Sequence, residues 1–326
     1  MRSKPIIACA AGASLALAGS ALAGNGGVAP VAPASPNADA IRESYWFVSI
    51  FAGAIFLLVE GVLISFVVRY RRRRRPRSAD GAQIHGSTRL ELLWTLGPVL
   101  ILSAIAVAVF AKLPELEDVP AAAAGEENLV VEITGVQYYW QFRYPNGVVA
   151  IDRLRAPEGR PVELRVTAPD WDVIHSWWIP ALGGKTDAIP GTVNSTWFRA
   201  DRGGVFEGQC AELCALYHAK MLAAVEVMPA ETFDTWLAER REAQTAGTSQ
   251  LGEEQYEGAC AKCHGLAGEG GYGPLLEGNA IIGDARTLER LLREGRGLMP
   301  PVGRDWDDQQ MRAMTEYLEE RFADGG

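Results

Sequence analysis

The sequence has 326 residues, 48% of them hydrophobic and 22% charged, and its formal net charge is -9. A chain of this length accommodates two or three domains. From Leu113 to the C-terminus, 19 Lys and Arg stand against 35 Asp and Glu, a net charge of -16. Because binding to phosphate requires a basic surface, this acidic part argues against a nucleic acid partner.

The N-terminus has the pattern of a secretory signal. A basic start, an alanine-rich apolar run and small residues at positions 21–23 follow one another, which is the order found in cleaved signal peptides. We therefore expect residues 1–23 to be a signal peptide and residues 24–44 to form a flexible leader, rich in Gly, Ala and Pro as far as Asn37. Cleavage would remove Cys9 and leave four cysteines in an exported chain.

Two apolar runs are long enough to cross a bilayer, which takes about 20 residues. They are residues 45–68, interrupted only by Glu60, and residues 92–112. The loop between them comprises residues 69–91, and seven arginines lie close together at positions 69–77. The positive-inside rule places such a loop in the cytoplasm. We predict a two-pass anchor in a bacterial-type cell membrane, with both ends of the hairpin on the extracytoplasmic side.

The remainder divides into a β-rich part and a helical part. Between residues 127 and 241, short runs of β-branched and aromatic residues are separated by Pro, Gly and Asp, at 129–134, 148–151, 162–167 and 196–199. Such runs predict a small β-sandwich or barrel, followed by a helical tail at 230–241. A polar linker at 242–250 precedes helical patterns from residue 251 to residue 326, which predict a separate all-α domain.

The helical part contains the motif Cys260-Ala-Lys-Cys263-His264. This C-x-x-C-H spacing attaches a c-type haem through two thioethers and places His264 as an axial ligand. A redox dithiol and half of a zinc site are the competing interpretations. A redox dithiol would need a βαβ context, and zinc would need a second Cys or His pair, and neither is present. Met299, in a proline-rich loop, is the expected second axial ligand, with Met311 and Met314 as weaker candidates.

A second cluster has the spacing H-x34-C-x3-C-x3-H-x2-M and consists of His175, Cys210, Cys214, His218 and Met221. Two thiolates, two imidazoles and one thioether are a soft ligand set that suits copper. A blue-copper site needs only one Cys, zinc rarely binds Met, and a disulfide would leave the other three residues unexplained. A copper chaperone of the C-x3-C type is the serious alternative.

At these residues the chain resembles the subunit II family of cytochrome c oxidases. The matching stretches are 175–180, 184–191 and the loop 210–221, and the resemblance extends from about Tyr45 to Trp236. It implies a cupredoxin barrel that holds a dinuclear copper centre, CuA. Cys210 and Cys214 would bridge the coppers, with His175, His218, Met221 and the Glu212 carbonyl as terminal ligands. The Glu212 side chain would bind a magnesium or manganese ion at the interface with the catalytic subunit.

Two other segments extend the resemblance. Glu91 matches a glutamate at the mouth of a proton path, although a carboxylate favoured by the helix dipole explains it equally well. Residues 137–140 match an aromatic run beside the copper, and imply an electron path through Tyr138 and Trp140. This chain has Tyr138 where many members have the tryptophan that receives electrons, and Thr192 where the family often has arginine.

The C-terminal part, from residue 251 to about 322, resembles small class I-like cytochromes c, and the whole arrangement resembles subunit II of caa-type oxidases. This implies a respiratory, proton-translocating oxidase in which electrons pass from the chain's own haem to CuA and then to catalytic subunit I. A soluble cytochrome c or a reductase complex would be the donor. The chain has only four histidines, too few for an oxygen-reducing centre of its own. The alternatives are a subunit of a CuA-containing nitric oxide reductase and a membrane-anchored copper-delivery protein.

Overall fold

The computed structural model describes residues 29–70, 83, 85–123, 127–247 and 250–323. The predicted signal peptide and most of the arginine-rich loop lie outside the described residues. The chain divides into two compact units, one made of Met1–Pro30 with Ala40–Leu116 and the other of Val31–Asp39 with Glu117–Gly326.

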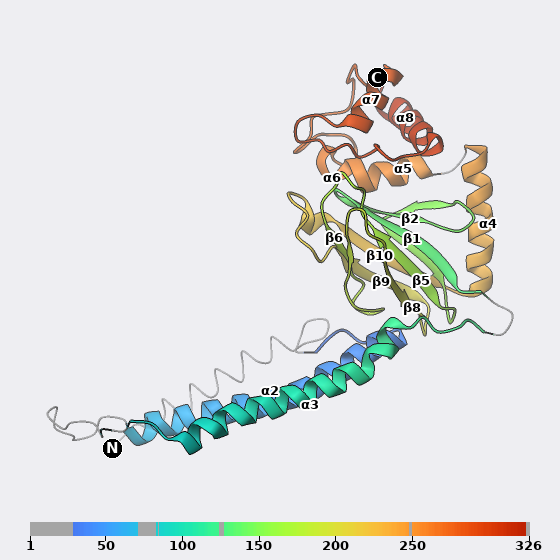
Figure 1. Ribbon diagram of the computed structural model, residues 1–326. Coiled ribbons are helices and arrows are strands. Elements are labelled where there is room, and N and C mark those ends of the chain that lie inside the picture. The colour runs from blue at the N-terminus through green and yellow to red at the C-terminus, as the bar shows by residue number, and fades with distance from the viewer. Residues whose placement is uncertain (1–28, 71–82, 84, 124–126, 248–249, 324–326) are drawn as a thin grey trace, which may run out of the picture. The chain divides into compact units, whose positions relative to one another are not determined.

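The first unit consists mainly of two long helices, α2 (Pro36–Tyr70) and α3 (Thr88–Glu117) (Figure 1). Both are long and apolar enough to cross a membrane, and their apolar windows are not buried within the protein. Lys112, near the end of α3, pairs at 2.8 Å with Glu43 near the start of α2. These features agree with the predicted two-helix hairpin.

Helix α2 begins earlier than the sequence suggested. Residues 36–44 were assigned to a flexible leader, but they are helical. Ala38 and Ala40 favour a helix by their propensity, and Asp39 favours its first turn through the helix dipole. These residues continue directly into the apolar run. The Asn37 side chain is buried and donates a hydrogen bond to the Trp197 carbonyl at 2.5 Å, and both residues belong to the second unit.

The second unit contains a β-sandwich, which confirms the predicted β-rich fold. One sheet has five strands in the order β3-β2-β1-β5-β8, a second has three in the order β4-β10-β9, and a third pairs β6 with β7. The strands are β1 (Leu129–Val136), β2 (Tyr139–Arg143), β3 (Val149–Ile151), β4 (Arg153–Pro157), β5 (Val162–Thr167), β6 (His175–Trp177), β7 (Thr186–Ala188), β8 (Asn194–Phe198), β9 (Gly204–Gln209) and β10 (Leu222–Met228).

Strand β2 has partners on both of its faces. Alternate residues of a strand point to opposite sides of the sheet. Trp140 and Phe142 are fully buried in the core of the sandwich. Tyr139 is equally buried, but it belongs to a second core formed mostly by the C-terminal helices.

Helices complete the unit: α4 (Ala230–Ala246), α5 (Leu251–Gln255), the π-helical turn η2 (Tyr256–Cys260), α6 (Ala261–His264), α7 (Ala285–Glu294) and α8 (Asp308–Phe322). Helix α4 continues five residues beyond the predicted 241, into the expected linker. Its Gln244 explains this, since the buried side chain donates to the Val149 carbonyl at 2.6 Å and accepts from the Val149 amide at 3.1 Å.

The predicted all-α domain is present, and it packs directly against the sandwich. Its core contains four residues from the first three strands, Val136, Tyr139, Val149 and Ile151. The β-rich and helical domains are therefore one compact unit, with apolar side chains shared between them.

Candidate functional site

The predicted copper ligands come together at one end of the sandwich. His175 is the first residue of β6. The other ligands lie in the loop that runs from the end of β9, through a single 3-10 turn (η1, His218–Lys220), to the start of β10. Because β9 and β10 are paired along their whole length, both ends of this loop are fixed, and it can hold side chains in a defined arrangement.

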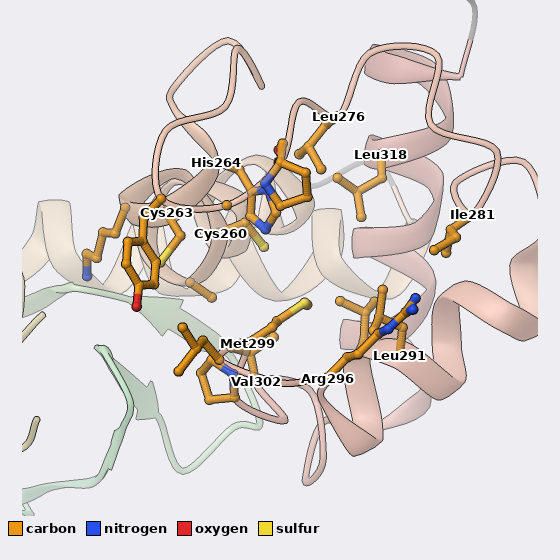
Figure 2. Close-up of a pocket in the computed structure, with 18 of the residues that line it drawn as sticks. Cys260, Cys263, His264, Leu276, Ile281, Leu291, Arg296, Met299, Val302 and Leu318 are labelled. Carbon is orange, nitrogen blue, oxygen red and sulfur yellow. Dashed lines mark hydrogen bonds between the residues drawn. The ribbon is translucent and has the colours of Figure 1, made fainter. Parts of the chain in front are cut away.

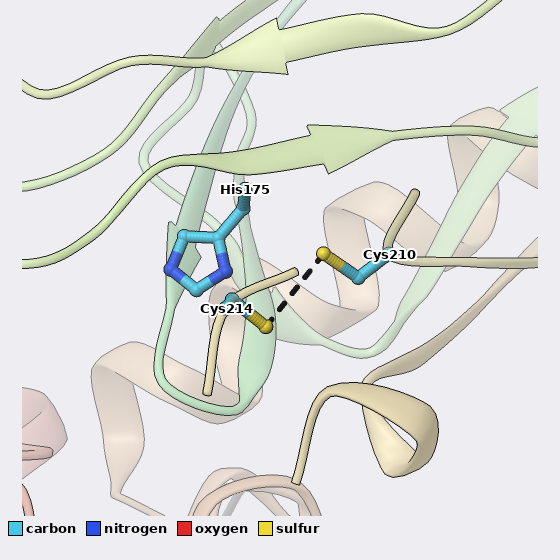
Figure 3. A group of neighbouring side chains, drawn as sticks. All are labelled: His175, Cys210 and Cys214. Atoms are coloured by element: carbon cyan, nitrogen blue, oxygen red, sulfur yellow. Dashed lines mark hydrogen bonds between the residues drawn. The ribbon is translucent and has the colours of Figure 1, made fainter. Parts of the chain in front are cut away.

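The ligand atoms lie within a few ångströms of one another. Ligand atoms of His175, Cys210 and Cys214 are all within 4.8 Å of each other, and Figure 3 shows these three side chains next to one another. The two cysteine sulfurs are 3.8 Å apart. From the Cys214 sulfur, His218 Nδ1 is at 3.6 Å and Met221 Sδ at 3.8 Å. All five predicted side chains thus converge on one point, with both thiols, His175 and Met221 buried.

This donor set fits copper. Neither ring nitrogen of His175 has a hydrogen-bond partner among the described residues, although both are buried, and a buried polar atom without a partner is costly. The nearest carboxylate oxygen, of Asp172, is 3.6 Å from Nε2, which is too long for a hydrogen bond. The sulfurs are too far apart for a disulfide, whose bond is about 2.05 Å. One ion can touch both, since metal–thiolate bonds are about 2.3 Å, as for zinc.

The electrostatics of the two thiols also favour a cation. The hydrogen bond between the two thiols lowers the pKa of Cys210, and the same hydrogen bond, burial and the charge on Cys210 raise the pKa of Cys214. Two neighbouring thiolates are unfavourable without a cation, because a like charge disfavours the ionised form of its neighbour. A bound metal ion removes this conflict, because it stabilises both thiolates.

The backbone carbonyl of Glu212 lies near the copper ligands, whereas its side chain is exposed. Its carbonyl oxygen is 3.2 Å from the Cys210 sulfur, so it can reach a metal held by that sulfur. Its side chain is exposed. The position agrees with the predicted terminal carbonyl ligand and leaves the carboxylate available to a second ion or a partner.

The second site is a cavity of about 510 Å³ in the helical domain. All four residues predicted to hold a haem line it: Cys260, Cys263, His264 and Met299. Figure 2 shows the imidazole of His264 and the thioether of Met299 projecting into the cavity from different segments. The cysteines lie on η2 and α6, where a π-helical turn changes to an α-helix. Such a change of helix type is frequent at functional sites.

His264 is oriented as an axial ligand should be. Its Nδ1 lies 2.8 Å from the Pro274 carbonyl oxygen. That oxygen can only accept, so Nδ1 carries the proton and Nε2 keeps its lone pair for a metal. Gly273 makes room for the ring, since a Cβ at this position would lie 2.7 to 2.9 Å from the imidazole atoms. The cavity therefore fits a covalently attached haem.

Two residues that line the cavity were not assigned a role from the sequence. Gln137 lines the cavity, and its side-chain amide donates to the Cys214 carbonyl at 2.9 Å. Lys262, inside the haem motif, donates to the Tyr138 carbonyl and to Asp152 Oδ2, both at 2.7 Å. The position of Gln137 next to Tyr138 is the one signal that could have identified it, whereas nothing in the sequence indicates that Lys262 points towards the sandwich.

The predicted aromatic residues lie between the two sites. Tyr138 lines the haem cavity and makes an edge-to-face contact with Tyr217, with ring centroids 5.6 Å apart. Partial burial raises the pKa of Tyr138. Trp140 is completely buried and makes edge-to-face contacts with His175 at 6.1 Å and Trp177 at 5.2 Å. Glu91 is exposed in the first turn of α3.

Comparisons with known proteins agree with this arrangement. Family models match residues 27–111 (cytochrome c oxidase subunit II, transmembrane domain), 147–228 (cytochrome c oxidase subunit II, periplasmic domain) and 247–318 (cytochrome c oxidase, cbb3-type, subunit III). Cytochrome c oxidase subunit 2 of Alkalihalophilus pseudofirmus is 31% identical over 305 residues, which cover 88% of each chain. The chain belongs to the cytochrome c oxidase subunit II family.

Other relatives are similar over part of the chain. Probable cytochrome c oxidase subunit 2 of Rickettsia bellii is 34% identical over 237 residues, which cover 66% of this chain and 84% of the relative. The crystal structure of the periplasmic domain of oxidase subunit II from Bradyrhizobium japonicum is 33% identical and covers 38% of this chain and 97% of that chain, with a TM-score of 0.35.

Membership of this family establishes the general role. The chain is a two-pass membrane subunit of an oxidoreductase complex, a haem–copper oxidase, and carries a cytochrome c domain at its C-terminus. A subunit II works with catalytic subunit I and other oxidase subunits.

Proposed function

We propose that this chain is the electron-input subunit of a haem–copper terminal oxidase. Electrons would pass from a haem c attached at Cys260 and Cys263 to a dinuclear copper centre, and then to the haems of the catalytic subunit, where oxygen is reduced to water. When bound, a copper pair shares one electron over two ions, so that little geometry changes on transfer. We assign its ligands to His175, Cys210, Glu212, Cys214, His218 and Met221, and the axial haem ligands to His264 and Met299.

The observation that supports an internal electron path is that the two sites share a wall. Gln137 lines the haem cavity, and its hydrogen bond reaches the backbone of the copper ligand Cys214. Tyr138 lines the same cavity and contacts Tyr217, the neighbour of His218. Electron tunnelling weakens steeply with distance and is favoured by bonded contacts. A donor in the cavity is therefore separated from the copper ligands by only one residue and one hydrogen bond.

The same contacts explain why Tyr138 can replace the tryptophan found in many relatives. A side chain that receives electrons from a separate, diffusing protein has to be accessible from solvent. Tyr138 is only partly exposed and belongs to the cavity wall of the attached cytochrome domain. We propose that an external donor, either a soluble cytochrome c or a reductase complex, delivers electrons to the haem rather than to the copper.

Orientation and proton uptake complete the proposal. The arginine-rich loop would lie in the cytoplasm, with the copper and haem domains on the periplasmic side. Glu91 would then lie at the cytoplasmic boundary, where it could pass protons to the catalytic subunit. The exposed carboxylate of Glu212 would bind magnesium or manganese at the subunit interface.

Rapid photoreduction of the purified, anaerobic oxidase tests the electron path. In the wild type the haem absorbance should show reduction first and reoxidation as the copper becomes reduced. Cys210→Ser should leave haem reduction intact and abolish the reoxidation. The proposal is contradicted if a Cys260→Ala/Cys263→Ala variant, which lacks the haem, still receives electrons at its copper at the wild-type rate from the same donor.

A further inference from the structure

The loop that carries Met299 is attached at its far end to the sandwich domain. Within the loop, Arg296 and Met299 exchange two backbone hydrogen bonds, of 2.9 and 3.0 Å. Pro300 and Pro301 follow, and proline has no amide proton to donate. The next firm attachment is at Val302, whose carbonyl accepts a hydrogen bond from the Tyr139 hydroxyl at 2.9 Å. Val302 is three residues from Met299, so this contact controls where the loop can place the thioether.

Tyr139 makes a second hydrogen bond to the same segment. The indole N–H of Trp306 donates to the Tyr139 hydroxyl oxygen at 2.9 Å. The Tyr139 hydroxyl therefore acts as a hydrogen-bond donor to Val302 and as an acceptor from Trp306. All three side chains are buried, with exposed fractions of 1% for Tyr139 and 4% each for Val302 and Trp306. Burial raises the pKa of Tyr139, so its proton is retained for donation at neutral pH.

Other residues on the same face of β2 also contact the cytochrome domain. Residues 139, 141 and 143 alternate along the strand and therefore point to the same side. Gln141 accepts from the Gln310 amide at 2.7 Å, and Arg143 Nη2 lies 3.3 Å from Asp307. The strand thus contacts a continuous stretch of the cytochrome domain, from Val302 to Gln310. Only Tyr139 is fully buried among these three strand residues.

We propose that Tyr139 and Trp306 form a brace through which the copper-binding domain holds the Met299 loop in the position needed for ligation of the haem iron. Tyr139 and Trp306 are positioning residues, because they act through the loop and do not touch the iron. This inference rests on the proposed function, which assigns Met299 as the axial ligand. It adds that the haem site is completed by a strand of the neighbouring domain.

Binding of imidazole to the ferric haem of the full-length protein tests the brace. Imidazole competes with the methionine, so its apparent affinity reports the fraction of molecules in which Met299 is off the iron. Tyr139→Phe removes both hydrogen bonds, the one to the Val302 carbonyl and the one from the Trp306 N–H, and we expect about a tenfold lower apparent Kd for imidazole. The sulfur-to-iron charge-transfer band of the ferric haem should weaken in parallel. Trp306→Phe, which keeps the bond to Val302, should have a smaller effect.

Tyr144→Phe is the matched control. Tyr144 is as buried as Tyr139, and its hydroxyl also makes two hydrogen bonds, both at 2.8 Å, to the backbone of Arg155 within the sandwich. This variant should lose comparable stability and keep the wild-type imidazole affinity. The near-infrared copper spectrum should be unchanged in all variants, which shows that each has folded.

Two different results would overturn the brace, and they can be distinguished. If Tyr139→Phe and Tyr144→Phe bind imidazole as the wild type does, the brace is wrong while the haem assignment stands. If the wild type lacks the sulfur-to-iron band, and Met299→Ala leaves imidazole binding unchanged, Met299 is not a ligand. In that case the proposed haem site fails, and the brace fails with it.

Discussion

Replacement of Lys262 by methionine should loosen the contact between the cytochrome domain and the sandwich. Lys262 forms a 2.7 Å ion pair with Asp152, and the two side chains are only 15% and 27% exposed. Removing one partner of a buried pair costs about 3–5 kcal/mol, because the other charge is left buried. Asp152 is partly exposed and still accepts from the Trp140 amide at 2.8 Å. We therefore expect the lower value of about 2–3 kcal/mol.

Hydrogen exchange of the purified full-length protein measures this effect. Amides of residues 256–264 should exchange about 30- to 150-fold faster in Lys262→Met, the factor that corresponds to the expected free energy. Arg143→Met is the control, because it removes another ion pair of the same interface, with Asp307, whose side chains are 35% and 43% exposed. Pairs this exposed contribute about 0–1 kcal/mol, so exchange should accelerate by at most about fivefold.

The effect of Lys262→Met should also depend on pH. Burial raises the pKa of Asp152, and Lys262 opposes this rise, so the variant has a still higher pKa for this carboxyl group. A folded-state pKa above the unfolded value means that stability decreases as pH rises through the folded pKa. The defect should therefore be larger at neutral pH than below the unfolded pKa of about 3.9, where only the loss of the hydrogen bond to the Tyr138 carbonyl remains. Equal exchange rates in the two variants at neutral pH would refute the reasoning.

Three further predictions concern the two sites. Gly208→Ala should destabilise the protein by about 1–3 kcal/mol, because the new Cβ would lie 2.1 Å from the backbone oxygen of Trp178. It should also lower the copper content. Chemical unfolding measures the first effect, and metal analysis measures the second. Gly258→Ala should increase protease cleavage between the sandwich and the cytochrome domain, because its Cβ would lie 2.3 Å from Ile151 Cγ2 and would force the two domains apart. The second substitution Ile151→Ala removes this clash and should restore the resistance to protease. Removal of copper by a chelator should make Cys210 and Cys214 reactive towards iodoacetamide, as mass spectrometry can detect; labelling of a haem-motif cysteine instead would contradict the assignment.

Much of the architecture could be predicted because its signals are local. The apolar runs, the β-branched runs and the two ligand motifs each depend on a short window of sequence. The converging ligands illustrate this, since four of the five side chains lie within residues 210–221 and only His175 is distant. A strict spacing in a short loop leaves few other geometries, and the predicted side chains are indeed neighbours in the structure.

The contacts between domains could not be predicted in this way, because they depend on tertiary packing. In the sequence, Tyr139 is only one member of an aromatic run. Its position next to Trp140 nevertheless places it on the face of β2 that is turned away from the core of the sandwich. A large aromatic residue on an outer face is a sign that another domain covers it. The contact of Lys262 with the sandwich could not be predicted, since either middle residue of a C-x-x-C-H motif can point to solvent. The helical start of α2 was missed because proline and alanine before it suggested a leader.

Near-infrared absorption and electron paramagnetic resonance of the copper-loaded protein, with the haem signal subtracted, test the central claim most directly. The proposed function predicts a mixed-valence signal from one electron shared over two coppers, lost in both Cys210→Ser and Cys214→Ser. A spectrum of a single copper ion that disappears with a mild chelator would contradict it, and would favour copper delivery over electron transfer.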